Sequence, residues 1–147
     1  AARSPDRVGA VAGVAGTMDP SRGRVKAQAP VLIIHGTADT MVPYAGGQGD
    51  TSLTRTDFAS VASVVKAFLA PWGAGLAETS RRIDRKDDGT AVVVTDYQKG
   101  GRVVLRLMTV EGGGHNWPGG REPRRNMAMT KEIEATTEIL KFFALHP

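Results

Sequence analysis

Two side chains of this sequence are of the types that perform acid–base chemistry, and each stands at the same distance beyond a predicted strand. Asp39 follows the apolar run 31–34 by five residues, and His115 follows Val110 by five residues. A carboxylate bound to imidazole Nδ1 fixes the ring's tautomer, turns Nε2 outward and stabilises the imidazolium that forms when a nucleophile gives up its proton. The spacing therefore predicts a general base and its orienting acid.

The two side chains can meet only if their parent strands are neighbours. Adjacent strands lie about 4.8 Å apart, so the 76 residues between the two positions (115 minus 39) would not separate them. Three glycines, 112 to 114, would let the backbone bend sharply enough to aim the imidazole. The plainer interpretation is that Asp39 forms a turn and His115 is a surface loop residue.

Three more side chains lie close to these loops in the sequence. His35 suggests a metal site with Asp39 and His115, but no further ligand has suitable spacing, so a buried, hydrogen-bonded histidine is favoured. Trp117 either walls a substrate pocket or packs the loop. Tyr44 either lines the same cleft or belongs to a structural turn. We therefore expect no metal and no cofactor, and name Trp117 and Tyr44 as candidate substrate-binding residues.

Four apolar runs predict strands. Residues 8–14 and 31–34 have the small and branched side chains of strands buried on both faces, and the connection between them is long enough for a parallel crossover. Residues 91–97 and 102–110 are rich in β-branched residues and form either a hairpin or two successive strands. The second of these runs leads into the loop that carries His115.

Two amphipathic patterns predict helices. One begins with Thr56 as its N-cap and ends at Pro71, and the other runs from about Thr130 through Phe143. Strands alternating with helices indicate an α/β fold with a mainly parallel sheet flanked by helices. We expect residues 1–147 to form a single domain that is part of a larger fold, with its chemistry at the carboxyl ends of the strands.

The composition excludes several classes of protein. Of the 147 residues 41% are apolar and 23% charged, as in globular proteins. Cysteine is absent, so there is no thiol nucleophile and no thiolate metal site. The net charge of +4 comes from scattered residues, and the densest basic run, Arg121, Arg124 and Arg125, is typical of a solvated loop. We expect neither nucleic acid nor a membrane as partner, because no stretch has about 18 consecutive apolar residues.

The loops that carry the two candidate residues resemble those of a known enzyme group. The segments that carry the likeness are "PDRVGAVAGVAGTM", "PVLIIHGTADTMVPYAGG", "TVEGGGHNWPGG" and "EIEATTEILKFFALHP". They are similar to the strand after the nucleophile helix, the acid loop, the histidine loop and the last helix of the polyhydroxybutyrate depolymerase and feruloyl or acetylxylan esterase group of α/β-hydrolases.

The resemblance implies a function and a site. It makes Asp39 the acid and His115 the base of a Ser-Asp-His triad, in the order usual for α/β-hydrolases. It also implies that Trp117 walls an aromatic or sugar-binding pocket. The substrate would be a carboxylic ester, linked to plant polysaccharide or to a polyester, and the resembling enzymes are often exported.

The sequence departs from this group in one respect, because it contains no G-x-S-x-G nucleophile elbow. None of its serines has the flanking glycines; they are Ser4, Ser21, Ser52, Ser60, Ser63 and Ser80. The oxyanion donors would lie upstream as well. We interpret the chain as a C-terminal piece, a truncation or a natural half-domain, and expect it to be inactive without an upstream serine segment.

Two interpretations from other classes of protein stand beside the hydrolase. The chain is alternatively a non-catalytic binding or assembly module that keeps the hydrolase fold. A partial sheet also presents an unpaired edge, which favours self-association or pairing with the missing N-terminal segment. A basic nucleic-acid binder is the least favoured interpretation and predicts steeply salt-dependent binding.

Overall fold

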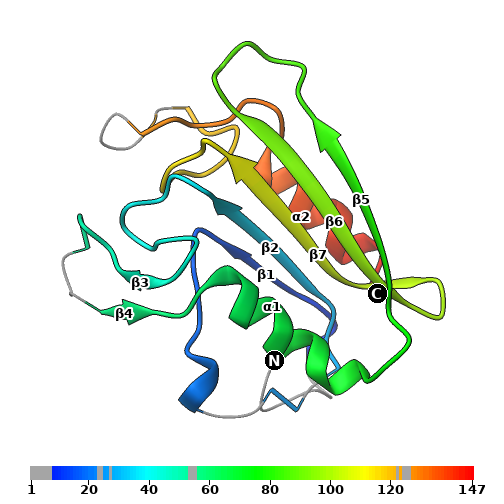
Figure 1. The fold of residues 1–147 in the computed structure, drawn as a ribbon. Helices are drawn as coiled ribbons and strands as arrows, with labels where there is room; N and C mark the ends of the chain where they lie inside the picture. Colours follow the sequence, from blue (N-terminus) through cyan, green and yellow to red (C-terminus); the bar gives the residue numbers. More distant parts are fainter. Residues whose placement is uncertain (1–7, 23–24, 27, 53–55, 122, 124–126) are drawn as a thin grey trace.

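The computed structural model describes residues 8–22, 25–26, 28–52, 56–121, 123 and 127–147 (Figure 1). Its elements in chain order are β1 Val11–Val14, β2 Val31–Gly36, β3 Gly47–Gln48, β4 Asp57–Phe58, α1 Val61–Leu69, β5 Ala77–Ile83, β6 Ala91–Lys99, β7 Arg102–Glu111 and α2 Ala135–Ala144. Ser4, Arg124 and Arg125, which were considered above, lie outside the described residues. No helix in the described ranges is long and apolar enough to cross a membrane.

Within these described residues, five strands form one mixed sheet in the order β1-β2-β7-β6-β5. β1, β2 and β7 are parallel, whereas β6 pairs antiparallel with both β7 and β5. The expectation of a mainly parallel sheet is therefore corrected. The cause is the link between β6 and β7: Gly100 and Gly101 both have positive φ and reverse the chain in two residues, whereas a parallel return needs a crossover of about a dozen.

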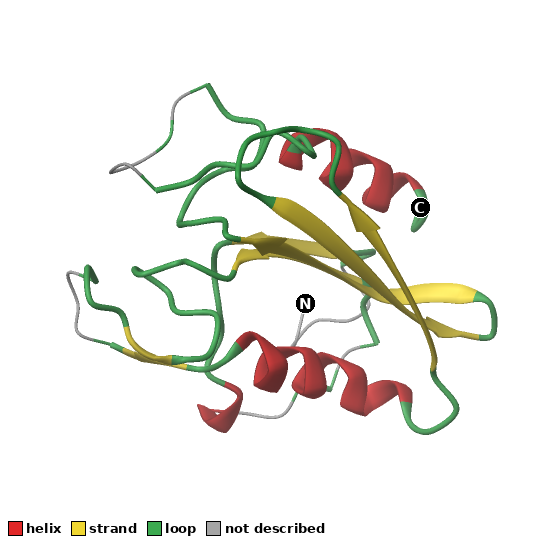
Figure 2. Ribbon diagram, turned by 45° about the horizontal axis from the view of Figure 1, so that its top comes forward, coloured by secondary structure: helices red, strands yellow, loops and turns green. Residues whose placement is uncertain are grey.

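The two helices cover opposite faces of the sheet, as Figure 2 shows. Alternate side chains of each strand point to opposite faces. On β2, Val31 and Ile33 pack with α1, whereas Leu32 and Ile34 pack in the cluster that contains Phe142 of α2. The α/β class expected from the sequence describes this layered arrangement, and the parallel neighbours β2 and β7 inside the sheet position the candidate site.

Both helices begin later than the sequence pattern predicts. α1 starts at Val61, and its N-cap is Ser60, whose hydroxyl accepts a hydrogen bond from Ser63 N–H. The predicted cap Thr56 precedes β4, which pairs with β3 and so holds these residues extended. α2 starts at Ala135 rather than near Thr130, with the Glu134 carboxylate as its cap.

β5 is a strand that the sequence analysis did not predict. Among its seven residues only Ile83 is buried, and the other six are exposed. The segment therefore lacks the run of branched apolar side chains that marks a buried strand. Its pairing with β6 makes it the outer strand of the antiparallel half of the sheet.

Candidate active site

The acid loop and the histidine loop leave the sheet side by side, because β2 and β7 are parallel neighbours. The register places Gly36 of β2 opposite Val110 of β7. Beyond the strands the two loops stay joined: Thr37 N–H donates to the Val110 carbonyl and Ala38 N–H to the Gly113 carbonyl, both at 2.9 Å. These bonds extend the pairing to the positions from which the candidate side chains project.

Asp39 and His115 are in direct contact. Nδ1 of His115 lies 2.8 Å from Oδ2 of Asp39. Because a carboxylate can only accept, Nδ1 carries a proton, and in the neutral ring Nε2 therefore has the lone pair. The Asp39 side chain is fully buried, while that of His115 is 20% exposed. The arrangement is a buried acid that orients a base open to solvent on one side.

The Asp39 carboxylate is held as an anion by a shell of donors. Its Oδ1 accepts the backbone N–H groups of Met41 at 2.9 Å and Val42 at 2.8 Å. Its Oδ2, besides meeting His115, lies 3.4 Å from Nε2 of the buried His35. Burial by itself would raise the pKa of Asp39, but hydrogen bonds from His35, Val42 and His115 outweigh it and bring the pKa below 3.8.

The glycines before His115 allow the loop to pass through a crowded space. Gly112 has a φ of 72°, a backbone angle that residues other than glycine rarely adopt. A β-carbon on Gly113 would come within 2.4 Å of the Val110 side chain, and one on Gly114 equally close to that of Met127. The bend expected from the three glycines is present, and close packing explains two of them.

The segment 127–130 supports the histidine loop from its other side. Asn116 Nδ2 donates to the carbonyl oxygens of Met127 at 3.0 Å and Ala128 at 3.2 Å. Gly114 N–H also donates to the Ala128 carbonyl, at 2.9 Å. No supporting role for this segment is expected from the sequence, and only the amide of Asn116, next to the candidate base, could have pointed to it.

His115 borders a surface depression of about 170 Å³ lined by Val14, Ala15, Asn116 and Trp117. Trp117 is 48% exposed and its Nε1 donates to the Thr136 hydroxyl at 3.2 Å. None of the described lining residues is a serine, threonine or cysteine. Within the described part of the chain, a nucleophilic hydroxyl is thus not part of this depression.

The described serines have other positions. Ser60 and Ser63 form the N-terminal cap of α1, Ser80 bonds the Thr95 hydroxyl across β5 and β6, and Ser21 bonds Asp19. Ser52 N–H donates to the Gly49 carbonyl in the loop after β3. These contacts belong to caps, turns and strand pairs.

Tyr44 does not share the depression with Trp117. Its hydroxyl lies 2.9 Å from that of Thr109, and its ring packs edge-on against His35 with the centroids 5.9 Å apart. It lines a separate, mainly apolar groove of about 590 Å³ between α1 and the sheet. Tyr44 thus lies beside His35 and lines a different surface from the one that His115 borders.

His35 is the histidine that was considered above as a metal ligand. In the described ranges no group of three or more His, Cys, Asp or Glu side chains is arranged to hold a metal ion. The expectation of a buried, hydrogen-bonded histidine is met at one ring nitrogen: Nε2 lies 2.8 Å from the Val42 carbonyl oxygen. Its contact with Asp39 was not anticipated, although the spacing of four residues within one turn could have suggested it.

Comparison with known proteins adds one relative. No family model matches the sequence. The chain is 36% identical over 141 residues to a protein of Nocardia uniformis subsp. tsuyamanensis named "Putative esterase NocK", and the match covers 85% of this chain and 40% of that protein. The chain thus spans less than half the length of this relative. By sequence it is similar to an esterase-type hydrolase.

Proposed function

We propose that this chain supplies the acid and the base of a serine-type carboxylic-ester hydrolase. The single observation that carries the proposal is the 2.8 Å contact between Nδ1 of His115 and the buried Oδ2 of Asp39. The contact leaves the Nε2 lone pair of His115 free to act at the depression. Similarity to a protein named as an esterase supports the same reaction class.

In this proposal His115 moves the proton and Asp39 orients the ring. As a serine oxygen attacks the ester carbonyl carbon, Nε2 takes the hydroxyl proton, and the imidazolium is stabilised by the Asp39 carboxylate. The same proton then passes to the leaving alkoxide as the C–O bond breaks. A water molecule, deprotonated by Nε2, hydrolyses the acyl-enzyme and restores the serine.

The nucleophile of this reaction would come from a segment outside the described residues. Val14, the last residue of β1, and Ala15, which follows it, line the depression beside His115. Among the described strands β1 is one of the two outer strands of the sheet, so a segment that pairs with its outer edge would reach the depression. We propose that this edge pairs with such a segment or, without it, with another copy of the chain.

The substrate we propose is an ester of small or polymer-linked acyl groups, of the kind handled by the polyhydroxybutyrate depolymerase and feruloyl or acetylxylan esterase group. The exposed indole of Trp117, held by Thr136, offers a flat apolar surface next to His115. Such a surface suits an aromatic ring or a sugar face.

Hydrolysis of p-nitrophenyl acetate tests the proposal. We expect the protein made from its complete coding sequence to be active, and His115→Ala to lower kcat by roughly 10⁶-fold. The 147-residue chain alone should be no faster than that variant. Activity that survives His115→Ala would refute the assignment, and a complete protein without activity would favour a binding or assembly module.

A further inference from the structure

We infer that His35 is a positioning residue for Asp39: it fixes the carboxylate from beneath and shares Oδ2 with His115. The inference rests on the proposed function only in naming Asp39 as a catalytic acid. His35 sits in β2, one residue before its end, and is 1% exposed. Its side chain therefore has a fixed place below the turn that carries Asp39.

The hydrogen-bond geometry assigns the proton of the His35 ring. Nε2 lies 2.8 Å from the Val42 carbonyl oxygen and 3.4 Å from Oδ2 of Asp39. Both oxygens can only accept, so Nε2 carries the hydrogen and shares it between them. Nδ1 is buried and has no hydrogen-bond partner among the described residues, as suits a bare lone pair and not a second N–H.

His35, Val42 and Asp39 form a closed ring of contacts. The Val42 carbonyl accepts from His35, while the Val42 N–H donates to Oδ1 of Asp39 at 2.8 Å. Oδ1 also accepts from Met41, so each carboxylate oxygen meets two donors. Loss of the His35 donor would remove one contact from the Val42 carbonyl oxygen and one from Oδ2 of Asp39 at the same time.

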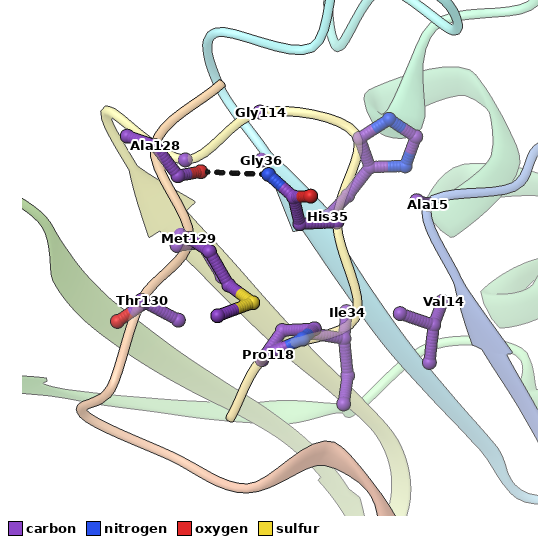
Figure 3. A pocket seen from close by; sticks show the side chains of 13 residues that line it. Val14, Ala15, Ile34, His35, Gly36, Gly114, Pro118, Ala128, Met129 and Thr130 are labelled. Atoms are coloured by element: carbon purple, nitrogen blue, oxygen red, sulfur yellow. Dashed lines mark hydrogen bonds between the residues drawn. The ribbon is translucent and has the colours of Figure 1, made fainter. Parts of the chain in front are cut away.

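The surroundings of His35 keep the ring in this orientation. The ring of Tyr44 packs against it in a T-shaped arrangement. His35 also borders a small space of about 10 Å³, with Val14 and Ala15 at one side of it and Met129 at the opposite side (Figure 3). A cavity of this size is at the lower limit for one water molecule, so the ring has little room to rotate.

Nitrogen-15 NMR of histidine-labelled protein, made from its complete coding sequence, tests the inference without turnover. His115→Gln identifies the His115 signals and His35→Gln those of His35. We expect His35 to carry its proton on Nε2 with Nδ1 bare at pH 7. A ring protonated on Nδ1, or on both nitrogens, would overturn the inference before any other variant is made.

Variants of His35 then separate positioning from packing. His35→Gln keeps a donor near the Nε2 position, whereas His35→Asn places its amide one atom short and His35→Phe has none. We expect the His115 Nδ1 proton resonance to leave its wild-type position in the Asn and Phe variants and to stay there in the Gln variant. Val92→Ala, a core substitution on β6, should lower the stability of the protein without moving this resonance.

The inference fails if that resonance is unmoved in the Asn variant, or if it moves as far in the Gln or Val92→Ala variants. The Gln and Asn pair suffices should His35→Phe not fold. In the ester assay, the Asn variant should lower kcat by about 10- to 100-fold with little change in KM. An inactive complete protein would refute the proposed function but leave the NMR outcome decisive for His35.

Discussion

Gly36 and Gly113 lie so close together that a β-carbon on Gly36 would stand 2.1 Å from the carbonyl oxygen of Gly113. That oxygen accepts the Ala38 N–H in the bond that joins the acid loop to the histidine loop. The two glycines thus set how closely the loops approach, and through them the contact between Asp39 and His115.

Gly36→Ala is expected to force these loops apart. Overpacking of this kind costs about 1–3 kcal/mol, which urea unfolding measures. Gly13→Ala on β1 is the matched control, because a β-carbon there meets no atom within 4 Å. It should change the free energy of unfolding by less than about 0.5 kcal/mol. Equal effects of the two substitutions would contradict this account of the loop approach.

Asp39→Asn is expected to lower stability by about 1–3 kcal/mol at neutral pH, because it leaves buried donors with a poorer acceptor. Hydrogen bonds to its carboxylate lower the pKa of Asp39 from its ordinary value in the folded protein. Its stabilisation is therefore complete above the unfolded pKa and lost as the pH falls through the lower folded one. The stability gap between wild type and variant should be constant above roughly pH 5 and shrink below roughly pH 4.

Thermal unfolding across this pH range measures the gap. Asp57→Asn, at an exposed position in β4, serves as control and should give a small difference with no such decline. A gap for Asp39→Asn that widens in acid would show that the carboxylate is not stabilised as an anion.

Phe142→Ala and Phe143→Ala compare two neighbours on α2. Phe142 is fully buried against β2, β6 and β7, whereas Phe143 is 38% exposed. We expect a loss of about 3–5 kcal/mol for the first and less than about 1 kcal/mol for the second. Chemical denaturation gives both values, and similar losses would mean that α2 packs on the sheet through a different face.

Trp117→Ala tests the surface beside the candidate base, on the basis of the proposed function. Removing the indole should raise KM for aromatic esters by about 5- to 30-fold, since about 1–2 kcal/mol of contact free energy is lost. The value of kcat should change little. Trp72→Ala, in the turn after α1, should leave KM unaltered. A fall in kcat alone would assign Trp117 to the positioning of His115 instead.

The meeting of Asp39 and His115 could be predicted because it depends on one property of parallel strands, which end at a common edge of the sheet. Each residue lies a few positions beyond its strand, so adjacency alone brings them together. The remaining support could not be read in the same way. The packing of Met127 and the bonds from Asn116 to residues 127 and 128 join segments whose spacing has no regular pattern.

The errors in the fold have a common physical origin. The apolar run of β7 is compatible with a parallel or an antiparallel partner, and the short link from Lys99 to Arg102 decides between them. β5 has one buried side chain, so its place in the sheet depends on backbone pairing that the sequence does not display. α1 starts later than predicted because Asp57 and Phe58, which precede it, belong to β4.

The position of β7 between β6 and β2 has a consequence for how the chain refolds. Its antiparallel partner is two residues away in sequence, whereas its parallel partner β2 is separated from it by all of residues 37–101. Hairpins form in about 1–10 μs, and contacts across long chain separations close far more slowly. We expect the hairpin of β6 and β7 to form first and β2 to pair with it afterwards. The strand that leads to His115 would then be in place before the strand that leads to Asp39.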